Sequence, residues 1–196
     1  MNANTLEYYD KNSVLYSQST LSVNMSHLYA EFLPYVSSGG HILDLGCGSG
    51  RDSLEFIKRG FQITALDGSE SLCRLAEENI GQSVIHQCFD EISFENEFDG
   101  IWACASILHL TSKQLPDVMC RLDRALKNNG ALYISFKYGD FEGYRSDRYF
   151  TDLDENKLAA LIKNTKHLQI EKTWLTDDAR PDSNDRWINC ICIKKC

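Results

Sequence analysis

A glycine-rich segment carries the clearest chemical signal in this sequence. Asp44-Leu45-Gly46-Cys47-Gly48-Ser49-Gly50 follows a short apolar run, 41–45, and precedes a segment with helical character, 51–59. Glycines at alternate positions let a backbone turn sharply and approach a ligand closely, and the free N–H groups at the start of a helix attract an anionic group. The segment therefore predicts a binding loop between a buried strand and a helix.

An acidic residue ends the next predicted strand. It is Asp67, 21 residues after Gly46, near the offset at which a carboxylate can accept hydrogen bonds from two ribose hydroxyls. A dinucleotide fingerprint has the spacing Gly-x-Gly-x-x-Gly, whereas this loop has Gly-x-Gly-x-Gly with Asp44 two positions before it. A carboxylate there would repel a pyrophosphate and could suit the ammonium of a methionine moiety. The two features together predict a nucleoside-bearing cofactor.

With this loop and its upstream acid, segment 42–136 resembles the class I S-adenosylmethionine-dependent methyltransferases. The resemblance implies a Rossmann-like α/β fold whose seven-stranded, mostly parallel sheet ends in an antiparallel strand, with helices on both faces. It also implies S-adenosylmethionine as cofactor, bound across the carboxyl ends of the first strands. The implied cofactor-binding residues are Asp44, Gly46, Cys47, Gly48, Arg51, Asp67, Gly68, Ser69, Phe89, Asp90, Ala103 and Cys104.

Within that superfamily, Gly50-Arg51-Asp52-Ser53 and Tyr8-Tyr9-Asp10 resemble the tellurite-resistance type of small-molecule methyltransferase. The resemblance implies in-line methyl transfer to a small acceptor: a thiol, oxyanion, amine or metalloid. Orientation of the nucleophile carries much of such catalysis, and a base is needed only when the acceptor must lose a proton. The catalytic candidates are His109, Tyr9 and Tyr16, although His109 could equally be a packed histidine. The candidate substrate-binding residues are Tyr8, Lys137, Tyr138, Arg145, Arg180 and Arg186.

Alternating strand and helix patterns predict one α/β domain over residues 1–196. The predicted strands are 41–45, 61–66, 84–88, 98–104, 131–136, 167–176 and 186–193, and the predicted helices are 20–36, 51–59, 69–80, 116–127 and 154–163. Thr20 is the expected N-cap of the first helix. Residues 1–36 are expected to form a helical cap, 41–136 a cofactor-binding core and 137–196 the substrate-side loop and final strands, with 137–149 as a lid or a plain surface loop.

The composition limits the partners. Twenty Lys and Arg against 28 Asp and Glu give a net charge of −8, which leaves no basic footprint for nucleic acid, and no apolar run is long enough for a membrane span. A cytoplasmic protein with reduced thiols is expected. Cys190 and Cys192, on one face of a strand, could be core residues or could hold a soft metal or metalloid with Cys196, and no metal site is predicted.

Three other functions stay open at this point. The first is a non-catalytic S-adenosylmethionine-binding module, because the cofactor motif predicts binding and not turnover. The second is a nicotinamide dehydrogenase, which the glycine spacing disfavours. The third is a tRNA or other nucleic-acid methyltransferase, which the net charge and the sequence Ala103-Cys104-Ala105-Ser106 after the fourth strand disfavour.

Overall fold

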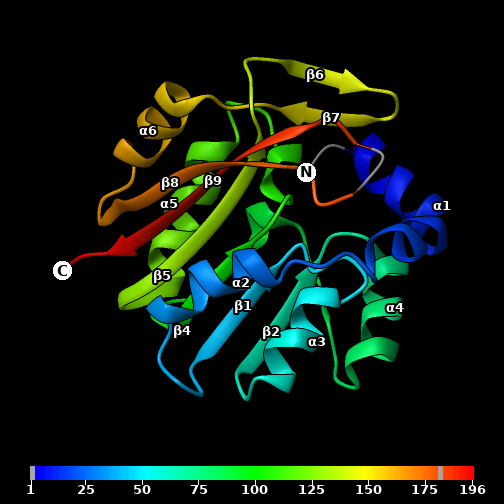
Figure 1. Cartoon of the computed structure of the whole chain (residues 1–196), viewed down its shortest axis with the longest axis horizontal. Helices are drawn as coiled ribbons and strands as arrows, with labels where there is room; N and C mark the ends of the chain where they lie inside the picture. The colour runs from blue at the N-terminus through cyan, green and yellow to red at the C-terminus, as the bar shows by residue number, and fades with distance from the viewer. Residues whose placement is uncertain (1–2, 181–182) are drawn as a thin grey trace.

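A seven-stranded sheet forms the centre of the molecule, and the computed structural model describes residues 3–180 and 183–196 (Figure 1). The strand order is β3-β2-β1-β4-β5-β9-β8. Strands β1 to β5 run parallel, whereas β9 is antiparallel to both of its neighbours. This arrangement confirms the predicted fold class. The strands are β1 (His41–Leu45), β2 (Gln62–Asp67), β3 (Ile85–His86), β4 (Phe98–Ala103), β5 (Leu126–Lys137), β8 (Leu168–Asp177) and β9 (Arg186–Lys194).

Helices cover both faces of the sheet. Helices α2 (Ser26–Phe32), α3 (Arg51–Lys58) and α4 (Glu70–Ile80) lie on one face, and α5 (Leu115–Ala125) and α6 (Glu155–Lys163) lie on the other (Figure 1). Successive side chains of a strand point to opposite faces, so each central strand supplies both cores. In β1, Ile42 packs with α2 and α3, whereas Leu43 packs with α5 and α6. Burial on both faces explains the continuous apolar runs of these strands.

Several short elements follow the carboxyl ends of the strands. They are the 3-10 turns η2 (Phe89–Glu91) and η3 (Ile107–His109) and a hairpin of β6 (Glu142–Arg145) and β7 (Arg148–Thr151). The N-terminal helix α1 (Ala3–Thr20) lies beside this hairpin (Figure 1). Thr5 of α1 accepts a hydrogen bond from the Tyr149 backbone N–H of β7 at 3.0 Å. Helix α1 and the hairpin therefore form one connected structure beside η3.

The predicted helix over 20–36 is wrong. The chain instead forms α1, a break at 21–25, α2 and a 3-10 turn, η1 (Leu33–Tyr35). Thr20 is the last residue of α1 and not an N-cap, and its hydroxyl donates back to the Tyr16 carbonyl at 2.8 Å. Helix α1 escapes pattern reading because its buried residues include Thr5 and Ser13, while Leu15 is 67% exposed. Its inner face thus lacks the apolar period that marks a helix in sequence.

Two further expectations are corrected. Segment 137–149 is not a loop throughout, since most of it enters the β6–β7 hairpin, whose turn includes Ser146 with a φ of +53°. The predicted strand 84–88 shrinks to Ile85–His86, because η2 begins at Phe89. Within residues 3–180 and 183–196, no helix is long and apolar enough to cross a membrane.

Candidate active site

The glycine loop joins β1 to α3 and has the sharp turns that its sequence predicts. Gly46, Gly48 and Gly50 have φ values of +74°, +57° and +82°, which L side chains rarely adopt. A Cβ on Gly46 would lie 2.5 Å from the Cβ of Ser106 and 3.2 Å from the Cζ of Phe89. The loop is therefore in close contact with the segment that follows β4 and with η2, and only glycine fits at Gly46.

Asp67 stands at the carboxyl end of β2, beside this loop. Its Oδ2 accepts a hydrogen bond from the Gly48 N–H and its Oδ1 accepts one from the Ser69 N–H, both at 2.9 Å. Burial raises the pKa of Asp67 to about 6, against the lowering effect of these backbone donors. Each carboxylate oxygen keeps a further lone pair, so the group can still accept from two hydroxyls. This geometry fits a ribose diol.

A buried carboxyl pair lies under the loop. Asp44 Oδ2 accepts a hydrogen bond from the Ser53 hydroxyl at 2.6 Å, and its burial raises its pKa, to which the nearby charge of Asp52 adds. Asp52 is held ionised by Arg51, whose Nε lies 2.6 Å away and which keeps the Asp52 pKa below its usual value. Burial raises the pKa of Asp44 to about 8, so Asp44 is largely protonated near neutral pH in the free protein, and a cation bound beside it, such as an ammonium group, would favour its ionised form.

The segment after β4 is strained and contains an unsatisfied polar atom. Ala105 has a φ of +51°, a conformation that costs of order 1 kcal/mol outside glycine and that concentrates at functional sites. The next residue, Ser106, has a buried hydroxyl oxygen with no hydrogen-bond partner in the described chain. This hydroxyl lies close to Gly46. Together with the glycine loop and Asp67, these features fit a polar, nucleoside-bearing cofactor at this end of the sheet.

Helix α1 covers the loop from the outside. Leu6 would contact a Cβ on Gly68 at 2.8 Å, and Tyr16 would contact one on Gly48 at 3.3 Å. Asp10 accepts a hydrogen bond from the Ser69 hydroxyl at 2.6 Å. The side of the site that contains Asp67 is thus covered by a helix that lies within the expected helical cap, 1–36, but whose bounds the sequence pattern did not predict.

A cavity of about 1000 Å³ opens beside the loop and extends toward the hairpin. It collects residues from the N-terminal helix, the ends of β4 and β5, and the segment between β8 and β9. The sequence-predicted residues in its lining are Tyr9, Tyr16, Arg51, Cys104, His109, Lys137 and Arg180. Burial raises the pKa of the Cys104 thiol to about 12, so Cys104 is a neutral wall residue and not a nucleophile.

Tyr9 and His109 form a neutral hydrogen-bonded pair in this cavity. His109 Nδ1 lies 2.6 Å from the Tyr149 carbonyl oxygen, which can only accept, so Nδ1 bears the ring proton. His109 Nε2 therefore accepts from the Tyr9 hydroxyl at 2.8 Å. Burial lowers the pKa of His109 to about 4 and raises the pKa of Tyr9. The His109 ring is thus buried, and the Tyr9 hydroxyl connects its Nε2 to the cavity. The Nε2 atom can receive a proton from that hydroxyl.

The structure does not bring all predicted residues to the cavity. Tyr138 donates to Glu155 at 3.1 Å, and Arg145 pairs with Asp152 at 2.7 Å. Arg186 stacks on Tyr138, and Tyr8 packs edge-on against Tyr9. Phe89 is buried against Gly46, Asp90 is exposed on η2, and Cys47 and Ala103 are buried. The predicted site residues that do not line the cavity are Tyr8, Asp44, Gly46, Cys47, Gly48, Asp67, Gly68, Ser69, Phe89, Asp90, Ala103, Tyr138, Arg145 and Arg186.

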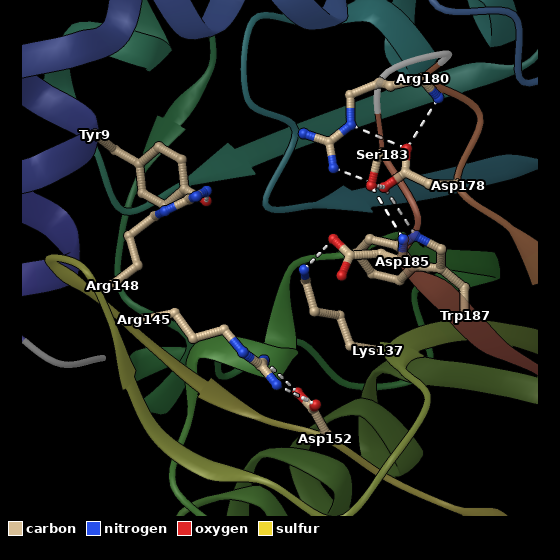
Figure 2. A network of polar contacts seen from close by, with 10 residues as sticks. All are labelled: Tyr9, Lys137, Arg145, Arg148, Asp152, Asp178, Arg180, Ser183, Asp185 and Trp187. Carbon is tan, nitrogen blue, oxygen red and sulfur yellow. Dashed lines mark hydrogen bonds and ion pairs between the residues drawn. The ribbon is translucent and has the colours of Figure 1, made fainter.

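Sequence reasoning missed two lining residues of consequence. Arg148, at the start of β7, reaches the Tyr9 hydroxyl with a guanidinium nitrogen at 3.4 Å (Figure 2). Ala105 lines the cavity with its strained backbone. The alternation of Tyr144, Arg145, Arg148 and Tyr149 around Ser146-Asp147 is a hairpin signal that could have indicated the fold of this segment, but not which arginine faces the cavity.

Comparisons with known proteins point to a methyltransferase. A family model described as a methyltransferase domain matches residues 42–130. An uncharacterized methyltransferase of Staphylococcus carnosus is 25% identical over 85% of this chain and 80% of its own length. A putative methyltransferase, YqeM, of Bacillus subtilis is 29% identical over 67% of this chain, and the match spans 59% of its length.

A solved structure shares the whole fold. It is the 1,6-didemethyltoxoflavin-N1-methyltransferase of Burkholderia thailandensis, bound to 1,6-didemethyltoxoflavin and S-adenosylhomocysteine. Its TM-score is 0.80 at 19% identity, and the match covers 99% of this chain and 88% of that one. With the glycine loop, Asp67 and the strand order, these findings support a class I S-adenosylmethionine-dependent methyltransferase.

Proposed function

We propose that this protein transfers the methyl group of S-adenosylmethionine to a small-molecule acceptor that bears a protic nucleophile. One observation carries the proposal. The cavity that begins at Arg51 and Cys104, beside the glycine loop, also contains the Tyr9–His109 pair. A methyl donor and a proton acceptor are the two requirements of such a transfer, and the fold supplies a place for each.

The residues around the loop would hold the cofactor. Asp67 would accept from the ribose hydroxyls, and the Asp44–Asp52 pair would stabilise the ammonium of the methionine moiety. Phe89, buried against Gly46, would cover one side of the adenine. Bound there, the cofactor supplies a methyl group on a sulfonium, which needs no further activation by the protein.

The protein's own contribution is orientation and proton transfer. The residues of the cavity would hold the acceptor atom in line with the methyl group that the cofactor would donate, the electron pair of the carbon–sulfur bond staying on sulfur. The acceptor's proton passes to the Tyr9 oxygen while the Tyr9 proton passes to His109 Nε2. Because burial lowers the His109 pKa to about 4, the pair takes this proton during methyl transfer and not before it.

Enclosure and charge support a small acceptor. The cavity is walled by α1, the hairpin and the segment between β8 and β9, which leaves room for a ligand of moderate size. The net charge of −8 works against binding of a nucleic-acid backbone. The toxoflavin precursor bound by the Burkholderia enzyme is also a small molecule, which agrees with this assignment.

Calorimetric titration tests the cofactor site first. The protein is titrated with S-adenosylmethionine, S-adenosylhomocysteine and NAD, as wild type, Asp67→Ala and Asp67→Asn, with Asp117→Ala on the exposed face of α5 as control. Loss of two charge-assisted hydrogen bonds of about 1.5 kcal/mol each predicts roughly 100-fold weaker adenosyl binding in Asp67→Ala. Binding of NAD in preference to both adenosyl ligands would refute the assignment.

A transfer assay then tests the reaction. Methyl-labelled S-adenosylmethionine is incubated with panels of small thiols, phenols, amines and acids, and with tRNA. Transfer to a small molecule that His109→Ala and Tyr9→Phe reduce supports the proposal. Transfer to tRNA alone would refute the small-molecule assignment, and adenosyl binding without transfer to any acceptor would favour a binding module instead.

A further inference from the structure

Most basic side chains around the cavity are neutralised by a carboxylate. Lys137 pairs with Asp185, and Arg180 pairs with Asp178 at 2.6 Å (Figure 2). Arg51, at the glycine-loop end, pairs with Asp52. These cations are therefore held in place by the protein and offer little net charge to a ligand. Among the described lining residues, one further arginine, Arg148, and one further carboxylate, the exposed Asp177 at the end of β8, remain.

Arg148 differs from these cations. Among the described residues it has no carboxylate partner, and its hydrogen bond is the long one to the Tyr9 hydroxyl, at 3.4 Å. Its Nε is buried and has no hydrogen-bond partner in the part of the chain that the structure describes. Aromatic rings surround the guanidinium instead, with the centroids of Tyr8 and Phe150 at 4.8 and 5.2 Å. Such contacts orient a cation but do not neutralise it.

This arrangement has a physical cost that a ligand can remove. A partly desolvated guanidinium with an unused N–H donor is unfavourable unless an anion meets it. The planar fork of arginine matches a carboxylate or phosphate with two parallel hydrogen bonds. Arg148 lines the cavity beside the Tyr9–His109 pair, whereas Arg51 stands at the glycine loop. An anion on Arg148 would therefore belong to the acceptor side of the cavity.

We propose that the acceptor is a small aromatic acid whose oxyanion binds Arg148. The inference rests on the proposed function and adds the class of substrate to it. The aromatic part follows from the flat side chains in the lining, Tyr9, Tyr16, Phe150 and Trp187. The acidic part follows from Arg148 alone. Its guanidinium fixes one end of the acceptor while the nucleophilic group points toward the cofactor.

A set of three probes with one ring tests this. They are 4-hydroxybenzoate, 4-hydroxyphenyl phosphate and the uncharged 4-hydroxybenzamide, whose dissociation constants are measured by ligand-observed NMR with and without S-adenosylhomocysteine. The proteins are wild type, Arg148→Gln, Arg148→Lys and Arg74→Gln. Arg74 forms an exposed ion pair on α4, so its variant removes the same charge away from the cavity. Thermal melts establish that each variant is folded.

The expected result is at least about tenfold tighter binding of an acid than of the amide, the factor that about 1.4 kcal/mol corresponds to. Arg148→Gln should abolish this preference, Arg148→Lys should keep part of it, and Arg74→Gln should keep all of it. The ratio of benzoate to phosphate binding distinguishes the two oxyanions. If Arg148→Gln does not fold, a reduced preference in Arg148→Lys decides the question.

Two results would overturn the inference. One is equal binding of acids and amide by the wild type. The other is an acid preference that survives in Arg148→Gln; if this variant also loses affinity for S-adenosylhomocysteine, the guanidinium serves the cofactor's carboxylate instead. The acid preference is also read without cofactor, so failure of wild-type S-adenosylhomocysteine binding counts against the proposed function separately.

Discussion

Replacing Tyr9 by Phe tests the hydrogen-bond network of the cavity without knowledge of the acceptor. The change removes one oxygen from a side chain whose ring packs against Tyr16 and His109 at centroid distances of 5.1 and 5.5 Å. The phenyl ring keeps these contacts. What is lost is the donor to His109 Nε2, since Nδ1 already donates to the Tyr149 carbonyl, together with the acceptor of the long, 3.4 Å hydrogen bond from Arg148.

The expected loss of stability follows from the unsatisfied nitrogen. A buried acceptor left without its donor costs about 1–3 kcal/mol. His109 is 4% exposed and its burial lowers its pKa to about 4, so neither water nor protonation readily relieves the loss at neutral pH. For a chain of this length, each kcal/mol corresponds to roughly 2–4 °C in Tm. At the middle of the energy range, about 2 kcal/mol, we therefore expect the Tm of Tyr9→Phe to be about 4–8 °C lower than that of the wild type.

Tyr16→Phe is the matched control. Tyr16 lies in the same helix and lines the same cavity, but its hydroxyl has no hydrogen-bond partner among the described residues. The two variants are compared by urea unfolding at pH 7.5, followed by circular dichroism. Tyr9→Phe is then repeated in a His109→Leu background, where the donor has no acceptor to satisfy and the change should cost less than about 0.5 kcal/mol.

Equal losses in the two tyrosine variants would refute the reasoning. The same conclusion would follow if Tyr9→Phe cost as much in the His109→Leu background as in the wild type. Either result would mean that Tyr9 stabilises the fold through its ring and that the Tyr9–His109 hydrogen bond contributes nothing measurable.

Two further predictions concern titration and reactivity. Burial lowers the pKa of His109 from 6.5 to about 4. The imidazole NMR signal of His109, assigned by comparison with His109→Gln, should therefore stay constant from pH 8 to 5.5. A titration midpoint near 6.5 would contradict this. Since the unfolded chain binds this proton more tightly, the stability contributed by His109 is present above about pH 6.5 and is lost as the pH falls toward 4. Burial raises the pKa of Cys104 to about 12, so iodoacetamide at pH 7.5 should alkylate the exposed Cys120 and Cys196 well before Cys104. Mass spectrometry of the digested protein measures this order, and early labelling of Cys104 would refute it.

The structure also settles the environment of the cysteine pair near the C-terminus. Cys190 and Cys192 face the same core cluster, are fully buried, and have their sulfur atoms 3.5 Å apart. No group of ligands suited to a metal is found among the residues that the structure describes.

The resemblance to the tellurite-resistance type stays a prediction, as does the role of each site residue.

The sequence alone determined the glycine loop, Asp67 and the alternation of strands and helices. These are local features, because a tight turn, a helix and a strand follow one another from Gly46 to Asp67, directly after the strand that ends at Leu45. Glycine spacing, strand-end acids and apolar runs are direct consequences of backbone geometry and burial. They can be read without knowledge of the neighbours that each residue meets.

Only the tertiary structure decided which side chains share the cavity. Helix α1 buries Thr5 and Ser13, so its sequence lacks the apolar period that indicates a helix. The helix nevertheless places Tyr9 beside His109, which is 100 residues away in the sequence. Arg145, Arg148 and Arg180 are equivalent in sequence, but two of them meet an aspartate and one does not. Pairing, burial and the proton position on His109 depend on contacts between distant segments, and such contacts exist only once the chain has folded.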